Sequence, residues 1–241
     1  ANANVIYVMN GPGFIYYNDE PALVQNTDFG TYEKISDEPL TIKYTVNEGI
    51  KWSDGTAVDE ADLLLAWTTI FNAVPDAGFA HANHRAELST AFPELGDRSI
   101  TITYDKAYVD WETQFDIGVA AHGTVQLAYP EITDAAEAKK QFMEAVENED
   151  AEWLSKVAEA WNGGYKSTNT PENELISLSR GPFLIEDLVE DQYVTLVANP
   201  DYSWGPSPFY ERITIRQIED SSAQLQGIEN GDIQVAAGQP T

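Results

Sequence analysis

Residues 44–63 read YTVNEGIKWSDGTAVDEADL, and this stretch predicts a strand, a tight turn and the start of a helix in immediate succession. The strand extends back to Glu38, because apolar and polar side chains alternate along it with the period of a half-buried strand. Asp54 and Gly55 form a pair that is favoured in tight turns. Asp59 is a suitable N-cap, since its carboxylate can accept hydrogen bonds from the first amides of a helix.

The helix that follows is apolar nearly all round as far as Phe71, which predicts that it is buried. Alternating apolar residues, typical of strands, and apolar residues at three- and four-residue steps, typical of helices, recur along the rest of the chain. They predict strands at 99–104, 183–186, 193–197 and 212–218, two helices within 133–161 that break near 148–150, and a helix at 221–230. This mixture of helices and strands indicates the α/β class.

The composition excludes several kinds of partner and chemistry. The 241 residues include 40 Asp and Glu but 13 Lys and Arg, which gives a formal charge of −27. Nucleic acid is therefore an unsuitable partner, because its phosphates would meet repulsion rather than a basic patch. Cysteine is absent, which excludes disulfides, thiolate metal sites and cysteine nucleophiles. No apolar run approaches the roughly 20 residues of a membrane span.

Three blocks of sequence, in this order and spacing, resemble the oligopeptide-type (family 5) solute-binding proteins of ABC importers. The first is residues 44–63, with the KWSDG turn and the helix that opens on Ala-Asp. The second joins SRGPF at residues 179–183 to VANPDY at residues 197–202. The third joins RITIR at residues 212–216 to NGDI at residues 230–233. Each block is weak by itself, because WSDG is a turn and Asn-Gly is a helix stop.

The resemblance implies an incomplete α/β fold of the periplasmic-binding-protein type (type II), with the extra small domain of family 5. Residues 1–178 would form that extra domain, and residues 179–241 would form part of the first binding lobe. The second lobe would be absent, as would the signal sequence and the lipid-attachment cysteine. Arg180 departs from the pattern, because the family often has a small residue at this position.

The function implied by the resemblance is that of the solute-binding component of an ABC importer. Such a protein captures oligopeptides or similar solutes at the cell surface and delivers them to permease subunits. The full-length protein would be extracytoplasmic and lipid-anchored. The solute itself is left open, because the family also covers nickel chelates and oligosaccharides.

Phe79, His81 and His84 are the candidate ligand-binding residues. The resemblance implies that the stretch after the buried helix lends an aromatic side chain to the solute, and Phe79 is the first aromatic there. The alternative is that Phe79 is a core aromatic. His81, His84 and Glu87 share a three-residue spacing that could present a metal site on a helix, but they lack the surrounding partners of established zinc motifs. We therefore predict polar loop residues and no metal.

The sequence predicts no catalytic residues and no cofactor. Asp59 and Asp62 form a carboxylate pair, but helix capping already explains Asp59. No G-x-S-x-G nucleophile elbow and no phosphate-binding loop occurs in the sequence. His122 is predicted to be a hydrogen-bonding residue of the core or of a loop. Two classes of function remain open: the solute-binding component, which we favour, and an acidic secreted α/β hydrolase.

Overall fold

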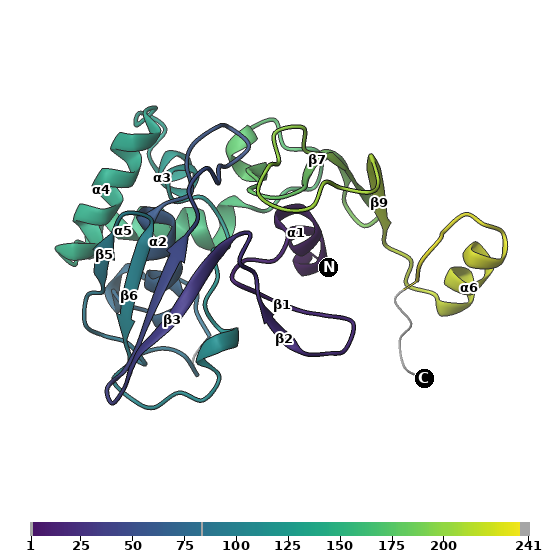
Figure 1. The fold of residues 1–241 in the computed structure, drawn as a ribbon. Coiled ribbons are helices and arrows are strands. Elements are labelled where there is room, and N and C mark those ends of the chain that lie inside the picture. The colour runs from purple at the N-terminus through teal and green to yellow at the C-terminus, as the bar shows by residue number, and fades with distance from the viewer. Residues whose placement is uncertain (1, 83, 237–241) are drawn as a thin grey trace.

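A four-stranded antiparallel sheet is built around β4 (Leu40–Val46), the strand predicted from the alternating pattern. The structure is a computed structural model that describes residues 2–82 and 84–236 (Figure 1). The sheet has the order β3 (Gly30–Asp37), β4, β6 (Ser99–Thr103) and β5 (Glu94–Gly96). Apolar side chains of β4 point into the core, where Ile42 and Tyr44 are fully buried, whereas Lys43 is exposed.

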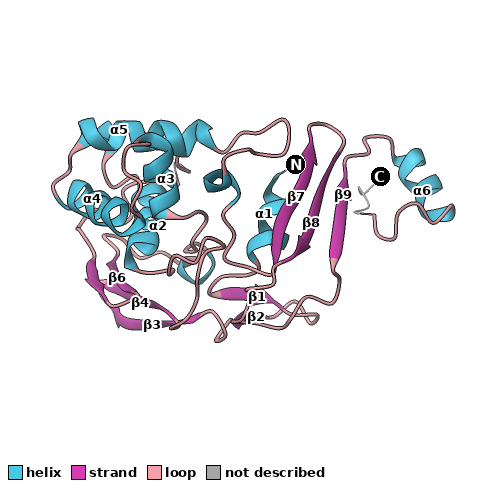
Figure 2. Cartoon of the chain, turned by 90° about the horizontal axis from the view of Figure 1, so that it is seen from above, coloured by secondary structure: helices cyan, strands magenta, loops and turns pink. Residues whose placement is uncertain are grey.

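Four helices cover one face of this sheet (Figure 2). They are α2 (Glu60–Phe71), α3 (Ala121–Ala128), α4 (Ala135–Glu147) and α5 (Ala151–Glu159). Helix α5 continues into a π-helical turn, η3 (Ala160–Gly164). The prediction of a buried α2 is confirmed, and so are the two helices α4 and α5 with their break near residue 148. Helix α3 was not predicted, because eight residues are too few to show a periodic pattern.

A second, three-stranded antiparallel sheet follows in the chain. It consists of β7 (Phe183–Val189), β8 (Tyr193–Ala198) and β9 (Arg212–Arg216). The predicted hairpin and the third strand are therefore confirmed. The predicted last helix, α6 (Ser221–Glu229), has no buried residue and lies beyond β9, apart from the rest of the chain (Figures 1 and 2).

The remaining elements are short and connect these layers. They are α1 (Asn2–Asn10), the hairpin of β1 (Ile15–Tyr17) and β2 (Leu23–Gln25), and the 3-10 turns η1 (Pro75–Ala77), η2 (Trp111–Thr113) and η4 (Glu174–Ser177). Among the described residues, no helix is both long enough and apolar enough to span a lipid bilayer.

The described part of the chain has two apolar clusters. The large one lies between the four-stranded sheet and its helices and runs from Phe14 to Leu178 in sequence. The small one joins Phe183 and Leu196 to Val5 of α1, which packs on β7. The division into residues 1–178 and 179–241 stays a prediction. Val5 shows that α1, at the start of the chain, packs against the second sheet.

The turn between β4 and α2 has the predicted geometry. Gly55 has a φ of +88°, a left-handed conformation, and its amide donates to Trp52 O at 2.9 Å. Asp59 caps α2, since its carboxylate accepts a hydrogen bond from the Ala61 amide at 3.1 Å. The predicted turn and cap are therefore confirmed.

Replacing Gly55 by alanine should destabilise the fold by about 1–2 kcal/mol, because an L-residue is strained at positive φ. A Cβ at Gly55 would meet no atom within 4 Å, so the effect would come from the backbone alone. Gly163→Ala is the matched control, because that glycine also has open space but no positive φ. Urea unfolding measures both variants, and equal midpoints would contradict the prediction.

Candidate binding site

The carboxylate of Asp62 joins α2, α3 and α4, three of the helices that cover the four-stranded sheet. Asp62 is fully buried in α2. One oxygen accepts the amide of Ala121, at the start of α3, at 2.7 Å. The other accepts the Asp59 amide and the Lys139 ammonium, both at 3.1 Å. A buried carboxylate needs such partners because its desolvation is costly.

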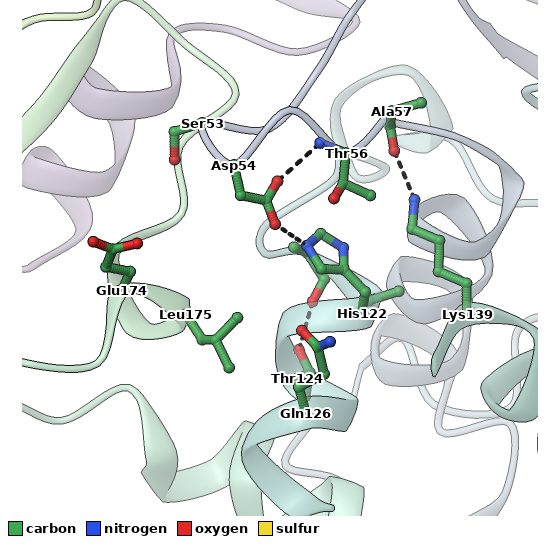
Figure 3. A network of polar contacts seen from close by, with 12 residues as sticks. Ser53, Asp54, Thr56, Ala57, His122, Thr124, Gln126, Lys139, Glu174 and Leu175 are labelled. Carbon is green, nitrogen blue, oxygen red and sulfur yellow. Dashed lines mark hydrogen bonds and ion pairs between the residues drawn. The ribbon is translucent and has the colours of Figure 1, made fainter. Parts of the chain in front are cut away.

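Lys139 of α4 supplies the positive charge that faces the carboxylates of Asp62 and Asp59. Its side chain is buried, and Nζ donates to Ala57 O at 2.6 Å (Figure 3). The same Nζ lies 3.0 Å from the Asp59 carboxylate. Burial by itself would lower the pKa of Lys139, but the charges of Asp62 and Asp59 outweigh it and raise that pKa. The side chain of Lys139 therefore keeps its positive charge in the folded protein.

A second polar contact holds the 52–55 turn against α3. The Nε2 atom of His122, which is fully buried, lies 2.8 Å from Oδ2 of Asp54 (Figure 3). Burial would raise the pKa of Asp54, but hydrogen bonds from His122 and from the Thr56 amide outweigh it and lower that pKa to about 2. The prediction that His122 is a core hydrogen-bonding residue is confirmed.

A cavity of about 410 Å³ opens beside α2. Its wall is made by α2, by the segment after η1, by the segment before α3 and by the π-helical turn. The lining residues are Leu65, Ala66, Thr69, Ile70, Ala80, His81, Ala82, Arg85, Asp116, Gly118, Val119 and Trp161. Most of these are apolar, and the polar or charged residues among them are few: Thr69, His81, Arg85 and Asp116. This combination is typical of small-molecule sites.

Arg85 is the cation in the cavity wall whose donors are incompletely used. Its Nη1 donates to Gln114 O at 3.3 Å, and its Nε is buried without a hydrogen-bond partner in the described structure. A guanidinium presents paired donors that suit a carboxylate. Arg85 is therefore able to bind an anionic group of a ligand.

Asp116 is the acidic residue of the wall, and its charge is already compensated. Its side chain is 48% exposed, and Oδ1 accepts a hydrogen bond at 3.2 Å from Arg180, which is buried behind it. Nη2 of Arg180 also donates to Ile117 O at 3.1 Å, and the guanidinium carbon lies 4.3 Å from the centre of the Phe29 ring. Asp116 thus adds a polar surface with little net charge.

The three candidate ligand residues have different positions. His81 lines the cavity, and its Nδ1 lies 3.0 Å from Phe79 O. Phe79 is buried in the large core, with 3% of its surface exposed, and it does not line the cavity. His84 is exposed and lies outside the lining. The role of all three in binding stays a prediction.

Sequence reasoning missed Arg85 and Trp161. Arg85 could have been noticed as one of 13 basic residues in a very acidic chain, directly after a candidate histidine. Trp161 gave no such signal, because its spacing fits the apolar face of a helix. Within residues 2–82 and 84–236, no three His, Asp or Glu side chains gather as metal ligands would.

Comparison with known proteins identifies the family. The family described as "Bacterial extracellular solute-binding proteins, family 5 Middle" matches residues 20–241. The chain belongs to this family. The description of the family names solute binding, and the resemblance seen in the three blocks of sequence is confirmed.

Curated relatives of this family 5 chain include lipoproteins and peptide binders. An uncharacterized lipoprotein of Mycobacterium tuberculosis is 27% identical over 234 residues, which cover 94% of this chain and 40% of the relative. The oligopeptide-binding protein OppA of the same organism is 24% identical over 236 residues, which cover 96% of this chain and 34% of OppA. The chain therefore spans about two fifths or less of the length of these relatives.

Solved structures confirm the fold of the family. A periplasmic EDTA-binding protein, EppA, superposes with a TM-score of 0.65 at 24% identity, over 95% of this chain and 37% of EppA. The oligopeptide-binding protein AppA of Bacillus subtilis, in complex with a nonapeptide, gives a TM-score of 0.63 at 16% identity, over 97% of this chain and 39% of AppA. The predicted fold class, an incomplete periplasmic-binding-protein type, is confirmed.

Replacing Lys139 by methionine should destabilise the protein by about 3–5 kcal/mol, because Asp62 would stay buried without a counter-charge. Lys140→Met is the matched control: its side chain is 62% exposed and its carboxylate partner, on Glu144, lies 3.9 Å away. The control should change stability by no more than about 0.5 kcal/mol. Chemical unfolding compares the two, and a similar loss in both would contradict the role given to Lys139.

Acid should remove the stabilisation that Asp54 provides. The pKa of this group is lowered in the folded state, so its contribution is complete above about pH 4 and is lost as the pH falls toward 2. Asp54→Asn should therefore be less stable than the wild type at pH 7, with a difference that shrinks below pH 4. Urea midpoints across this range measure it, with the exposed Asp97→Asn as the control for the change in net charge. A difference that stays constant with pH would exclude the mechanism.

Proposed function

We propose that this chain is part of the solute-binding component of an ABC importer. The full-length protein captures an oligopeptide or a similar carboxylate-bearing solute outside the cell and delivers it to permease subunits. It acts at the cell surface and is lipid-anchored. Membership of the family and the lipoprotein relatives support this assignment.

The observation that carries the proposal is the cavity beside α2. Arg85 offers a buried donor, Nε, that has no hydrogen-bond partner among the described residues, and His81 adds a second nitrogen group in the same wall. Apolar side chains such as Leu65 and Val119 provide the rest of the contact surface. This arrangement suits a solute that combines a carboxylate with apolar groups, as a peptide does.

The ligands named for the structural neighbours share this chemistry. They include EDTA, a nonapeptide and agropinic acid, each of which carries at least one carboxylate. The proposal therefore specifies the shared group, a carboxylate, and takes oligopeptides as the first solutes to test.

The cavity gives less support to the alternative of a hydrolase. Among the described lining residues, Thr69 is the one that carries a hydroxyl group. That hydroxyl donates to Leu65 O at 2.9 Å within α2. A nucleophile has to be aligned with a base instead, so we propose that the protein is a binder and not an enzyme.

The full-length protein should bind peptides from a mixed oligopeptide library in calorimetric titration. Arg85→Gln should weaken that binding by about 10-fold or more, because a charge-assisted hydrogen bond contributes roughly 1.5–3 kcal/mol. Arg98→Gln is the control with the same loss of charge, since Arg98 pairs with Asp97 outside the cavity.

Equal affinity of the Arg85→Gln variant and the wild type would exclude Arg85 from the site. Turnover of a peptide by the wild-type protein would favour the hydrolase. Residues 1–241 alone should bind more weakly than the full length, because two-lobed binders enclose the solute from both sides.

A further inference from the structure

The π-helical turn η3 brings two neighbouring side chains to the cavity and its rim. It extends α5 by the residues Ala160–Gly164. A π-helical turn is rare and less favourable than an α-helical one, and such turns are frequent at functional sites. Its third residue, Asn162, contacts the segment that includes His81, and its second residue, Trp161, lines the cavity beside Gly118.

Asn162 fixes the backbone of that segment on both sides of Phe79. Its side-chain amide donates to Gly78 O at 2.9 Å, and its side-chain oxygen accepts the amide of Ala80 at 2.7 Å. The Phe79 ring is buried in the core between these two contacts. The backbone is thus held at three points directly before His81, which lines the cavity together with Arg85 of the same segment.

Trp161 supplies the aromatic surface of the cavity. It is half-buried and belongs to the lining. A Cβ placed on Gly118 would lie 4.0 Å from Cη2 of Trp161, so the indole lies beside the segment that precedes α3. The ring therefore lines the cavity beside Gly118, which lies 43 residues earlier in sequence, and part of its surface stays accessible.

We propose that this turn is the specificity element of the cavity, in which Trp161 contacts an apolar or aromatic group of the solute and Asn162 is a positioning residue for His81. The inference rests on the proposed function and adds to it. The solute then carries an apolar group on the Trp161 side of the cavity in addition to the carboxylate assigned to Arg85. In this proposal Trp161 makes an aromatic contact of the kind that the resemblance implies for Phe79, whose own role in binding stays a prediction.

The role of Trp161 is tested on the full-length protein with two peptides, Ala-Phe-Ala and Ala-Ala-Ala. Trp161→Ala should weaken binding of Ala-Phe-Ala by about 2- to 10-fold, as expected for the loss of an aromatic contact. The affinity for Ala-Ala-Ala should change less. Trp161→Phe should retain the preference for Ala-Phe-Ala, because it keeps an aromatic face, and it should lose the part of the peptide-induced fluorescence change that comes from Trp161.

The role of Asn162 is tested against a matched asparagine. Asn162→Ala should weaken both peptides by a similar factor, about 2- to 10-fold, because the segment must then be ordered on binding. Asn162→Asp keeps the acceptor for the Ala80 amide and should restore part of the affinity. Asn148→Ala removes an exposed asparagine that donates to Glu144 O at the end of α4, and it should leave affinity unchanged. Melting temperatures of the two alanine variants control for stability.

The possible results separate the two proposals. Wild-type affinity in both Trp161→Ala and Asn162→Ala would overturn the specificity element and leave the proposed function intact. If the wild type binds neither peptide, the peptide class is wrong, and amide hydrogen exchange then decides the role of Asn162. Faster exchange at Ala80 in Asn162→Ala, but not in Asn148→Ala, would support the positioning role, and unchanged exchange would overturn it.

Discussion

The buried carboxylate of Asp62 is the constraint on which the packing of α2, α3 and α4 depends. A charge without solvent has to be matched by donors in fixed places, and here the donors come from the turn before α2, from the start of α3 and from α4. The start of α3 and helix α4, which are 59 and 77 residues from Asp62 in sequence, are thereby placed relative to one carboxylate in α2. Apolar packing alone would allow these helices to slide, because the hydrophobic effect is not directional.

The cavity is a consequence of this placement. One of its walls is the side of α2 that follows Asp62, and another is the segment from Asp116 to Val119, which ends where Ala121 donates to that carboxylate. The ion pair of Asp116 with Arg180 anchors the same segment from behind. Rigid elements therefore determine the shape of the cavity, and the groups that distinguish one solute from another are carried by the segments between them.

Phe79 illustrates how far the sequence could be interpreted at the site. It follows the buried helix in sequence, and His81, two residues later, lines the cavity, whereas Phe79 does not. The direction of the Phe79 side chain could not be predicted, because a loop has no fixed period that assigns residues to the core or to the surface. The ring fills the core, and the aromatic surface of the cavity comes from Trp161 in a helix that the sequence indicated as ordinary amphipathic structure.

The sequence by itself determined the local structure and the family. Alternating side chains specified β4 and β6, Gly55 and Asp59 specified the turn and the cap, and three blocks of sequence indicated family 5. These features depend on neighbours within a few residues, so local patterns encode them. Only the tertiary structure decided which residues meet at the cavity, because Arg85, Asp116 and Trp161 come from separate segments whose positions depend on packing and on the buried charges.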